Sequence, residues 1–288
     1  MNLSKYAFFL VFVVSCSTTR QEGWNKSTKS VELTAAQKTS LTKEAKDLWA
    51  KRVETETLKK SLEKFEQLHS ANLNDLETLI YLTRGYYFLA DAHIDDIEKK
   101  KEVYEKATAF GEKALATNEE FKKKVSSGKS VEESLDVLTV NEVPAMYWTA
   151  ASLGKWAKAT GIAAALKYKT RIKGLIERVE KLQPNYFYGA APRYWGGFYA
   201  VAPSFAGGDL KKSKTSFEKS LTIAPEYLGT KVLMAEVYWT KAGDKKQFEA
   251  TLKDVLNSKE DKHKELGAEN FWEKKKAEKL LKKMDDLF

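Results

Sequence analysis

The chain has 288 residues, 43% of them hydrophobic, so it is long enough to bury a sizeable core. Its 49 basic and 40 acidic residues give a net charge of +9, but the two signs are mixed along the chain, which is typical of solvated helix faces and disfavours a nucleic-acid-binding protein. Five prolines and the abundance of Ala, Leu, Lys and Glu disfavour an all-β protein and favour helices.

Residues 1–15 are predicted to be a secretory signal peptide. The start is positively charged, and the apolar run Tyr6–Val14 is too short to span a bilayer as a helix. The sequence Val-Val-Ser-Cys that ends at Cys16 is similar to a bacterial lipobox, and this cysteine is the only one in the chain. We expect lipid attachment at Cys16 and a mature periplasmic chain, 16–288; the alternative is an ordinary signal peptide cut elsewhere. Ser17, in place of Asp, favours the outer membrane.

Residues 16–40 predict a flexible tether between the lipid and the folded protein. The segment is polar, and Ser, Thr, Lys and Gln are frequent in it. The helical domain is then expected over 41–288. It would fold without disulfides, because no other thiol is present.

A repeated register indicates tetratricopeptide-like helical hairpins in this domain. In the second helix of such a hairpin, small or apolar residues recur with spacings of four and then three, which places them on one helix face. Pro184 and Pro225 lie at the stop positions of two copies, and Gly208 and Gly243 lie where the preceding turns belong. The five copies are Ser61, Phe65, Leu68; Ala107, Gly111, Ala114; Ile172, Ile176, Val179; Ser213, Phe217, Ser220; and Phe248, Leu252, Val255.

The sequence therefore predicts an all-α fold, an α-solenoid of five divergent hairpins. The segment Ala268–Leu287 is amphipathic and basic, and it predicts a C-terminal capping helix with a wet outer face; a helix on a membrane surface is the alternative. The polar insertion 118–143 is either a mobile loop or a short helix. The expected first helices of the hairpins are 41–57, 76–93, 144–160, 192–201 and 227–242.

The stretch Pro184–Gly208 departs most strongly from the composition of the chain. It is rich in aromatic residues and glycine, and Arg193 is its only charged residue. Burial fits this composition, because burying an unpaired charge is unfavourable, and the glycines favour close packing or sharp turns. Arg193 is either a structural cation held by carbonyls and rings, or an anchor for an anionic ligand.

Motifs for catalysis and metal binding are scarce. The histidines at 69, 93 and 263 lie in separate segments and no HExxH motif is present, so we predict no metal site. Gly128-Lys129-Ser130 lacks the glycine that a phosphate-binding loop needs at position 123. No nucleophile and base can be paired from the sequence. We expect neither an enzyme nor a bound cofactor.

Recognition remains, and the aromatic residues indicate where it would occur. Residues 146–205 hold 12 aromatic side chains, and Trp148 and Trp156 lie eight residues apart on one predicted helix, beside Lys155. They are either core residues or the lining of a ligand pocket with Lys155 and Arg193 as cationic poles, since an arginine fork suits a carboxylate. The candidate ligand-binding residues are Tyr147, Trp148, Lys155, Trp156, Tyr188, Arg193 and Tyr194.

Three long segments resemble one transporter family. They are YWTAASLGKWAK (147–158), YFYGAAPRYWGGFYAVAPSFAGGDL (186–210) and SFEKSLTIAPEYLGTKVLMAEVYW (216–239). With the lipobox and the helical hairpins, their order is similar to that in the T component of tetratricopeptide-repeat-associated TRAP transporters, a periplasmic lipoprotein. The resemblance is strongest across 140–240 and fades in the last fifty residues.

This resemblance implies a lipid-anchored helical solenoid that associates with the substrate-binding protein, the P component, of an ion-driven TRAP uptake system. It also implies a small hydrophobic or carboxylate-bearing ligand that the protein would pass toward the membrane subunits. The resemblance does not decide between a monomer and a homo-oligomer. The alternative, from another class, is a tetratricopeptide lipoprotein scaffold for assembly in the cell envelope, which would grip peptides in a groove and have no small-molecule role.

Overall fold

The computed structural model describes residues 20–259 and 264–288. These residues form helices and no β-strand, so the predicted all-α fold is confirmed. None of the helices in this part of the chain is both long and apolar enough to cross a membrane. The predicted signal peptide and Cys16 lie outside the described residues.

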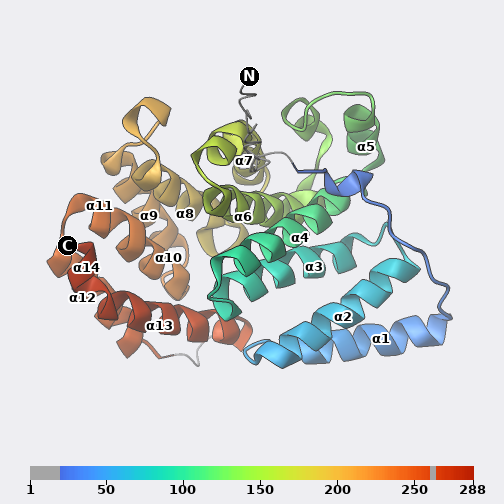
Figure 1. Ribbon diagram of the computed structural model, residues 1–288, viewed down its shortest axis with the longest axis horizontal. Helices are drawn as coiled ribbons and strands as arrows, with labels where there is room; N and C mark the ends of the chain where they lie inside the picture. Colours follow the sequence, from blue (N-terminus) through green and yellow to red (C-terminus); the bar gives the residue numbers. More distant parts are fainter. Residues whose placement is uncertain (1–19, 260–263) are drawn as a thin grey trace, which may run out of the picture.

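Five helical hairpins follow one another along the chain, and each packs against the next (Figure 1). Two of the first helices contain a π-helical turn, named η2 and η6. This arrangement agrees with the predicted solenoid. The hairpins are α1 (Ala35–Trp49) with α2 (Thr55–Ala71); α3 (Leu76–Phe88) and η2 (Leu89–His93) with α4 (Ile97–Leu115); α6 (Val143–Thr160) with α7 (Ile162–Leu182); α8 (Tyr186–Val201) with α9 (Leu210–Ile223); and α10 (Leu228–Leu233), η6 (Met234–Trp239) and α11 (Thr240–Ala242) with α12 (Lys245–Asn257).

The predicted registers all fall on the second helices, and every one of their residues is buried. Their small members let neighbouring helices approach closely. On α9, the hydroxyl of Ser213 donates to the carbonyl of Gly196 at 2.7 Å, and that of Ser220 donates to the carbonyl of Gly189 at 3.0 Å. A Cβ at Gly196 would lie 2.7 Å from the Phe217 ring, so the packing of α8 on α9 requires glycine there.

The predicted bounds of the first helices agree with the structure in three hairpins, to within one residue at each end. The predicted helix 192–201 begins earlier, at Tyr186. The predicted helix 41–57 is wrong, because α1 covers residues 35–49. A capping box between Thr34 and Gln37 starts α1.

Residues 20–34 differ from the predicted tether. Arg20 donates to the Glu112 carboxylate on α4 at 2.5 Å, and the backbone N–H of Gly23 donates to the same carboxylate at 2.6 Å. Both contacts are buried. Trp24, in the turn η1 (Gly23–Asn25), packs its ring against Phe121 in the insertion 118–143. Residues 20–25 are therefore held on the domain and residues 35–40 are helical, whereas residues 29–32 between them are exposed. The polar composition of the segment concealed the few residues that hold it on the domain.

The insertion 118–143 contains a short helix and two 3-10 turns, α5 (Glu119–Ser126), η3 (Glu132–Val137) and η4 (Val140–Glu142). Phe121 is fully buried, and the guanidinium of Arg178 on α7 donates to the Leu138 carbonyl at 3.1 Å. These contacts hold the insertion against α7.

The C-terminal helix α13 (Gly267–Lys282) begins beside the first hairpin and runs back to the last one (Figure 1). It follows η7 (Lys264–Leu266) and precedes α14 (Met284–Leu287). On one face, Ala277 is buried in the core of the last hairpin. On another, the Glu269 carboxylate accepts from Arg52 at 2.5 Å and from Arg84 on α3 at 2.7 Å. The predicted cap therefore also joins the two ends of the array, and its outer face is partly covered.

Glu269 is 6% exposed. Burial alone would raise the pKa of this carboxyl, but the nearby Arg84 and Arg52 outweigh it and lower the pKa below the usual value. Trp272 adds to the same contact, because its indole N–H donates to the Val53 carbonyl at 3.2 Å. The closing contact is thus a buried ion triad beside an anchored aromatic ring.

Glu269→Gln should destabilise the protein strongly. The substitution keeps the shape of the side chain but leaves Arg52 and Arg84 without their acid, and breaking a buried pair in this way costs about 3–5 kcal/mol in the free energy of unfolding. Urea unfolding followed by circular dichroism measures the loss.

Asp285→Asn is the control, because it removes an acid whose ion pair with Lys245 is solvent-exposed. It should leave the unfolding midpoint unchanged. Equal midpoints for the two variants would contradict the structural role of Glu269.

Candidate functional site

A continuous group of aromatic rings lies where α3, α6 and α8 meet. The Trp148 ring lies 5.2 Å from the Tyr87 ring and 4.7 Å from the Phe187 ring, between centroids. Tyr188 and Tyr227 stack with their planes 8° apart, and Phe187 lies against both. We define the central aromatic cluster as Tyr87, Tyr147, Trp148, Phe187, Tyr188 and Tyr227.

Arg84 connects this cluster to the closing contact. Its guanidinium lies 4.9 Å from the Phe187 ring centroid and 5.5 Å from that of Trp148, in cation–π geometry. One terminal nitrogen donates to Glu269, whereas the buried Nε has no hydrogen-bond partner among the described residues. Arg84 is therefore a cation that lies against the central aromatic cluster and has an unpaired N–H donor.

The first turn of α8 has an unusual backbone. Phe187, Tyr188 and Gly189 all adopt left-handed conformations, with φ of 40°, 58° and 70°. Such a conformation is strained by roughly 1–2 kcal/mol for each residue that carries a Cβ. It persists only where the surroundings hold it, and strain of this kind is found preferentially at functional sites.

Arg193 holds this strained turn. Its guanidinium donates to the carbonyls of Tyr188 at 2.8 Å and Phe187 at 3.2 Å, and to the Tyr147 hydroxyl at 3.1 Å. The Tyr227 ring centroid lies 4.4 Å away, and the side chain is buried. Carbonyls and a ring meet the charge, which is the geometry of the structural cation and not of a ligand anchor.

A second polar group surrounds Asp91 in the π-helical turn η2. Its carboxylate accepts from Lys155 on α6 at 2.6 Å, from Lys276 on α13, and from the Tyr104 hydroxyl at 3.0 Å; Glu273 pairs with Lys276 at 2.9 Å. We call Asp91, Lys155, Glu273 and Lys276 the Asp91 cluster. Burial opposes ionisation of Asp91, but the two ammonium groups outweigh it and hold the pKa well below the usual value.

The Asp91 cluster opens to solvent on the side of Lys155. The Lys155 side chain is 40% exposed, whereas that of Asp91 is 12% exposed. An ammonium has three donors, and the structure uses one of those of Lys155, on Asp91. Lys155 therefore keeps donors that can face an approaching anion.

The structure brings four of the predicted ligand-binding residues together, namely Tyr147, Trp148, Tyr188 and Arg193. Trp156 instead packs against Tyr168 on α7, and Tyr194 packs against Trp195 and Phe198. Eight residues turn a helix by about 80° beyond two full circles, which is enough to send Trp148 and Trp156 into different interfaces. The predicted shared face is therefore not found.

Other residues of the site were missed by sequence reasoning. Tyr87 and Asp91 are spaced four apart on a helix that was predicted correctly, so their shared face could have been noticed. Arg84 lies on the same helix. Lys276, by contrast, contacts Asp91 across 185 residues of sequence, and no local pattern indicates such a contact.

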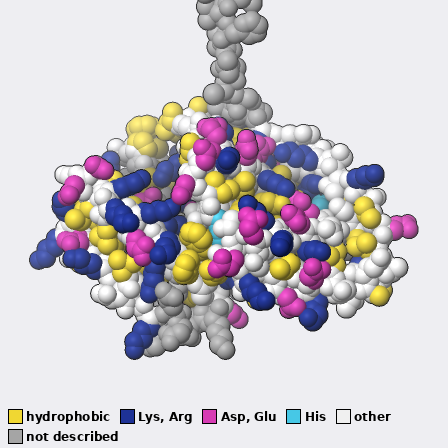
Figure 2. All heavy atoms as spheres, turned by 60° about the horizontal axis from the view of Figure 1, so that its bottom comes forward, with side chains coloured by type: hydrophobic (Ala, Val, Ile, Leu, Met, Phe, Trp, Pro, Cys, Tyr) yellow, Lys and Arg dark blue, Asp and Glu magenta, His cyan; other side chains and the backbone are white. Residues whose placement is uncertain are grey.

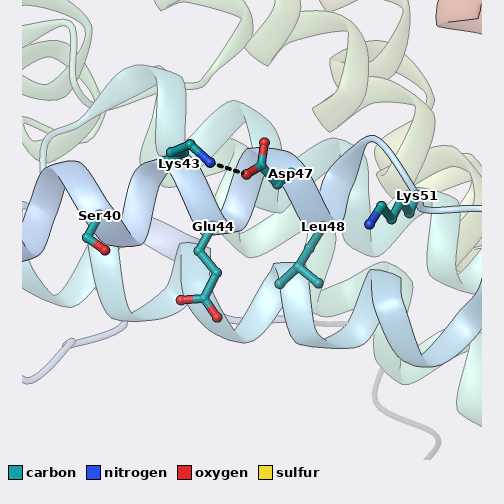
Figure 3. A pocket seen from close by; sticks show the side chains of 6 residues that line it. All are labelled: Ser40, Lys43, Glu44, Asp47, Leu48 and Lys51. Carbon is teal, nitrogen blue, oxygen red and sulfur yellow. Dashed lines mark hydrogen bonds and ion pairs between the residues drawn. The ribbon is translucent and has the colours of Figure 1, made fainter.

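A shallow hollow of about 380 Å³ lies over α1, away from these groups (Figure 3). Five of its six lining residues are polar or charged, and Lys43 and Asp47 form an exposed ion pair one turn apart along α1. In the described part of the chain, no group of three or more His, Cys, Asp or Glu could hold a metal ion. The hollow is lined by Ser40, Lys43, Glu44, Asp47, Leu48 and Lys51.

A comparison with protein-family models matches residues 55–288 to the family described as TRAP transporter T-component. The matched range begins with α2 and includes the central aromatic cluster, the Asp91 cluster and α13. A search of curated proteins finds no match.

Arg193→Ala should destabilise the protein by about 3 kcal/mol or more, because two buried carbonyls and a hydroxyl lose their donor and the strained turn loses its support. Thermal and urea unfolding measure the effect. Arg193→Lys keeps the charge but cannot reproduce the planar fork of the guanidinium. Its stability should therefore lie between that of the wild type and that of Arg193→Ala. Wild-type stability in Arg193→Ala would contradict the structural role.

Stability should also fall as the pH is lowered from about 6.5 to 4. Burial lowers the pKa of His93 from 6.5 to about 4, and its ring lies 4.5 Å from the Trp272 ring at the closing contact. In this window the unfolded chain binds a proton that the folded protein does not, so acid favours unfolding. Burial lowers the pKa of His69 to about 4 as well.

Urea midpoints at several pH values test this dependence. His93→Asn should show a smaller decrease of the urea midpoint between pH 6.5 and 4 than the wild type, because one of the two buried imidazoles is gone. A pH profile identical to that of the wild type would contradict the assignment to His93.

Proposed function

The chain belongs to the TRAP transporter T-component family, and from this premise we propose that it is a lipid-anchored periplasmic subunit that binds the substrate-binding protein of a TRAP uptake system. The observation that carries the proposal is the extent of the family match. It covers four complete hairpins, the second helix of the first, and the closing helix α13, so it concerns the folded domain as a whole.

The proposed anchor is a lipid on Cys16. A short apolar segment and a lipobox-like sequence precede this cysteine, and no other cysteine is present in the chain. Ser17 favours the outer membrane as the location. The domain would then face the periplasm, where extracytoplasmic substrate-binding proteins operate.

The proposed ligand is a small hydrophobic or carboxylate-bearing molecule. Tyr147, Trp148 and Arg193 are buried, so they would form the floor of a site and not its contact surface. Lys155, which is 40% exposed and has donors left over, would meet a carboxylate. The Nε of Arg84, which is buried and has no partner among the described residues, would lie in the same floor beside the rings of the central aromatic cluster.

The contribution of this subunit is recognition, not chemistry. The cations of both clusters are held by acids, carbonyls and rings, and such groups bind and orient a partner. Ion-driven movement of the solute belongs to the membrane subunits of the system in this proposal.

A crosslinked pull-down of the C-terminally tagged full chain from its own host tests the proposal. Mass spectrometry should identify an extracytoplasmic solute-binding protein as the dominant partner. Envelope-assembly factors or wall enzymes as the dominant partners would contradict it and favour the scaffold.

Two controls accompany this experiment. A second tagged lipoprotein of the same host shows which partners are captured through the envelope alone. Cys16→Ser should remove the lipid, which the intact mass of the chain measures, and a variant that keeps the lipid mass would contradict the proposed anchor.

A further inference from the structure

The third and fourth hairpins share an edge that is both apolar and basic. Ile162 and Leu166 on α7 are 69% and 50% exposed, and Val201 and Phe205 at the end of α8 are 56% and 86% exposed. Lys211 and Lys212 at the start of α9 are exposed as well. We call these six residues the basic apolar edge.

Side-chain contacts between α7 and α8 indicate that the two parts of this edge lie together. The indole of Trp195 donates to Glu180, and the Lys173 ammonium lies 5.9 Å from the ring centroids of Trp195 and Phe198. The two helices thus run antiparallel, with the end of α8 directed toward the start of α7. Val201 and the turn η5 (Ser204–Ala206) therefore lie on the side of Leu166 and Ile162.

The charge of this edge is predominantly positive. The chain carries six basic and no acidic residues between Glu142 and Glu177, and of these Lys155 and Arg171 pair with Asp91 and Glu22. No acidic residue lies between Glu180 and Asp209, and Asp209 lies 3.9 Å from Lys212. On the face that Figure 2 shows, by contrast, Lys and Arg side chains are interspersed with Asp and Glu. An acidic partner is thus favoured at the edge, and it must also accept exposed aromatic and aliphatic side chains.

The path of the N-terminal segment points to the same side. Glu22 pairs with Arg171 on α7 at 2.8 Å, so the described chain begins beside the middle of α7, about 13 Å along the helix from Ile162. Cys16 precedes Arg20 by four residues, which span at most about 14 Å. A lipid on Cys16 would hold α7 close to the bilayer, and this step rests on the proposed anchor.

We propose that the basic apolar edge is a membrane-contact surface that lies on an anionic phospholipid bilayer. Phe205 and its aliphatic neighbours enter the boundary between headgroups and acyl chains, and the lysines meet the phosphates. Surface binding of this kind gains strength from buried apolar area and from attraction to anionic lipid together. The contact would fix the orientation of the domain, which a lipid alone does not.

Vesicle co-sedimentation of the chain from residue 17 tests the proposal without the lipid. This chain keeps every described residue, so a missing lipid or a missing transporter does not affect the result. We expect binding to phosphatidylcholine vesicles that contain phosphatidylglycerol, little binding to phosphatidylcholine alone, and weaker binding at high salt. Phe205→Ser should weaken the binding by about tenfold, the effect of losing one buried large side chain.

Matched variants separate the edge from the rest of the surface. Val201→Ser should weaken binding and Val140→Ser should not, although the two valines are 56% and 55% exposed. Lys211→Glu with Lys212→Glu should abolish binding, whereas Lys122→Glu with Lys123→Glu on α5 should not. Lys212 and Lys122 each lie 3.9 Å from an acid three residues away, so the two pairs start from similar surroundings.

Absence of binding to the anionic vesicles would overturn the proposal, and so would equal losses in the edge variants and their controls. A change of oligomeric mass or of the captured partner in Phe205→Ser, with unchanged vesicle binding, would assign the edge to a protein contact and overturn it too. Thermal unfolding of each variant should match the wild type, because these side chains are exposed.

Discussion

One buried carboxylate makes the two ends of this helical array depend on each other. A stack of hairpins couples each repeat only to its neighbours, so its ends are normally independent. Glu269 changes this, since it binds Arg52 after the first helix and Arg84 on the third. Trp272 and Lys276 follow on the same face of α13, where they contact the Val53 carbonyl and Asp91. A single line of side chains on one helix thus reaches from the first hairpin to the second.

This closure explains why the centre of the molecule tolerates features that are unfavourable by themselves. Arg84 and Asp91 are held from α13, and both lie against rings or hydroxyls of the central hairpins. Beside Arg84, the first turn of α8 keeps two non-glycine residues in left-handed conformations, with Arg193 bound to their carbonyls. Strain of this kind persists where its surroundings over-determine it. The frame that α13 completes provides such surroundings.

The sequence predicted what depends on local periodicity and little of what depends on distant contacts. The 4-then-3 register identified the buried face of every second helix, because a helix face repeats at that spacing. Composition did not predict the contacts of Arg20 and Trp24, which hold the described start of a polar segment on the domain. The predicted burial of the aromatic stretch holds for its first part but not for Val201 and Phe205, which are 56% and 86% exposed. Arg84, which lies against Phe187, comes from a helix far away in the sequence, and so do Asp91 and Lys276 of the second cluster. Their roles follow only from the assembled fold.

The distribution of charge follows from the same frame. Three acids in the interior meet bases: Glu269 meets two arginines, Asp91 two lysines and Glu112 Arg20. These interior groups leave little net charge that needs a partner. The positive excess of the chain therefore lies largely on the surface, and Lys211 and Lys212 of the basic apolar edge carry part of it. The interior charges thus maintain the fold, and the exposed ones remain for contacts outside it.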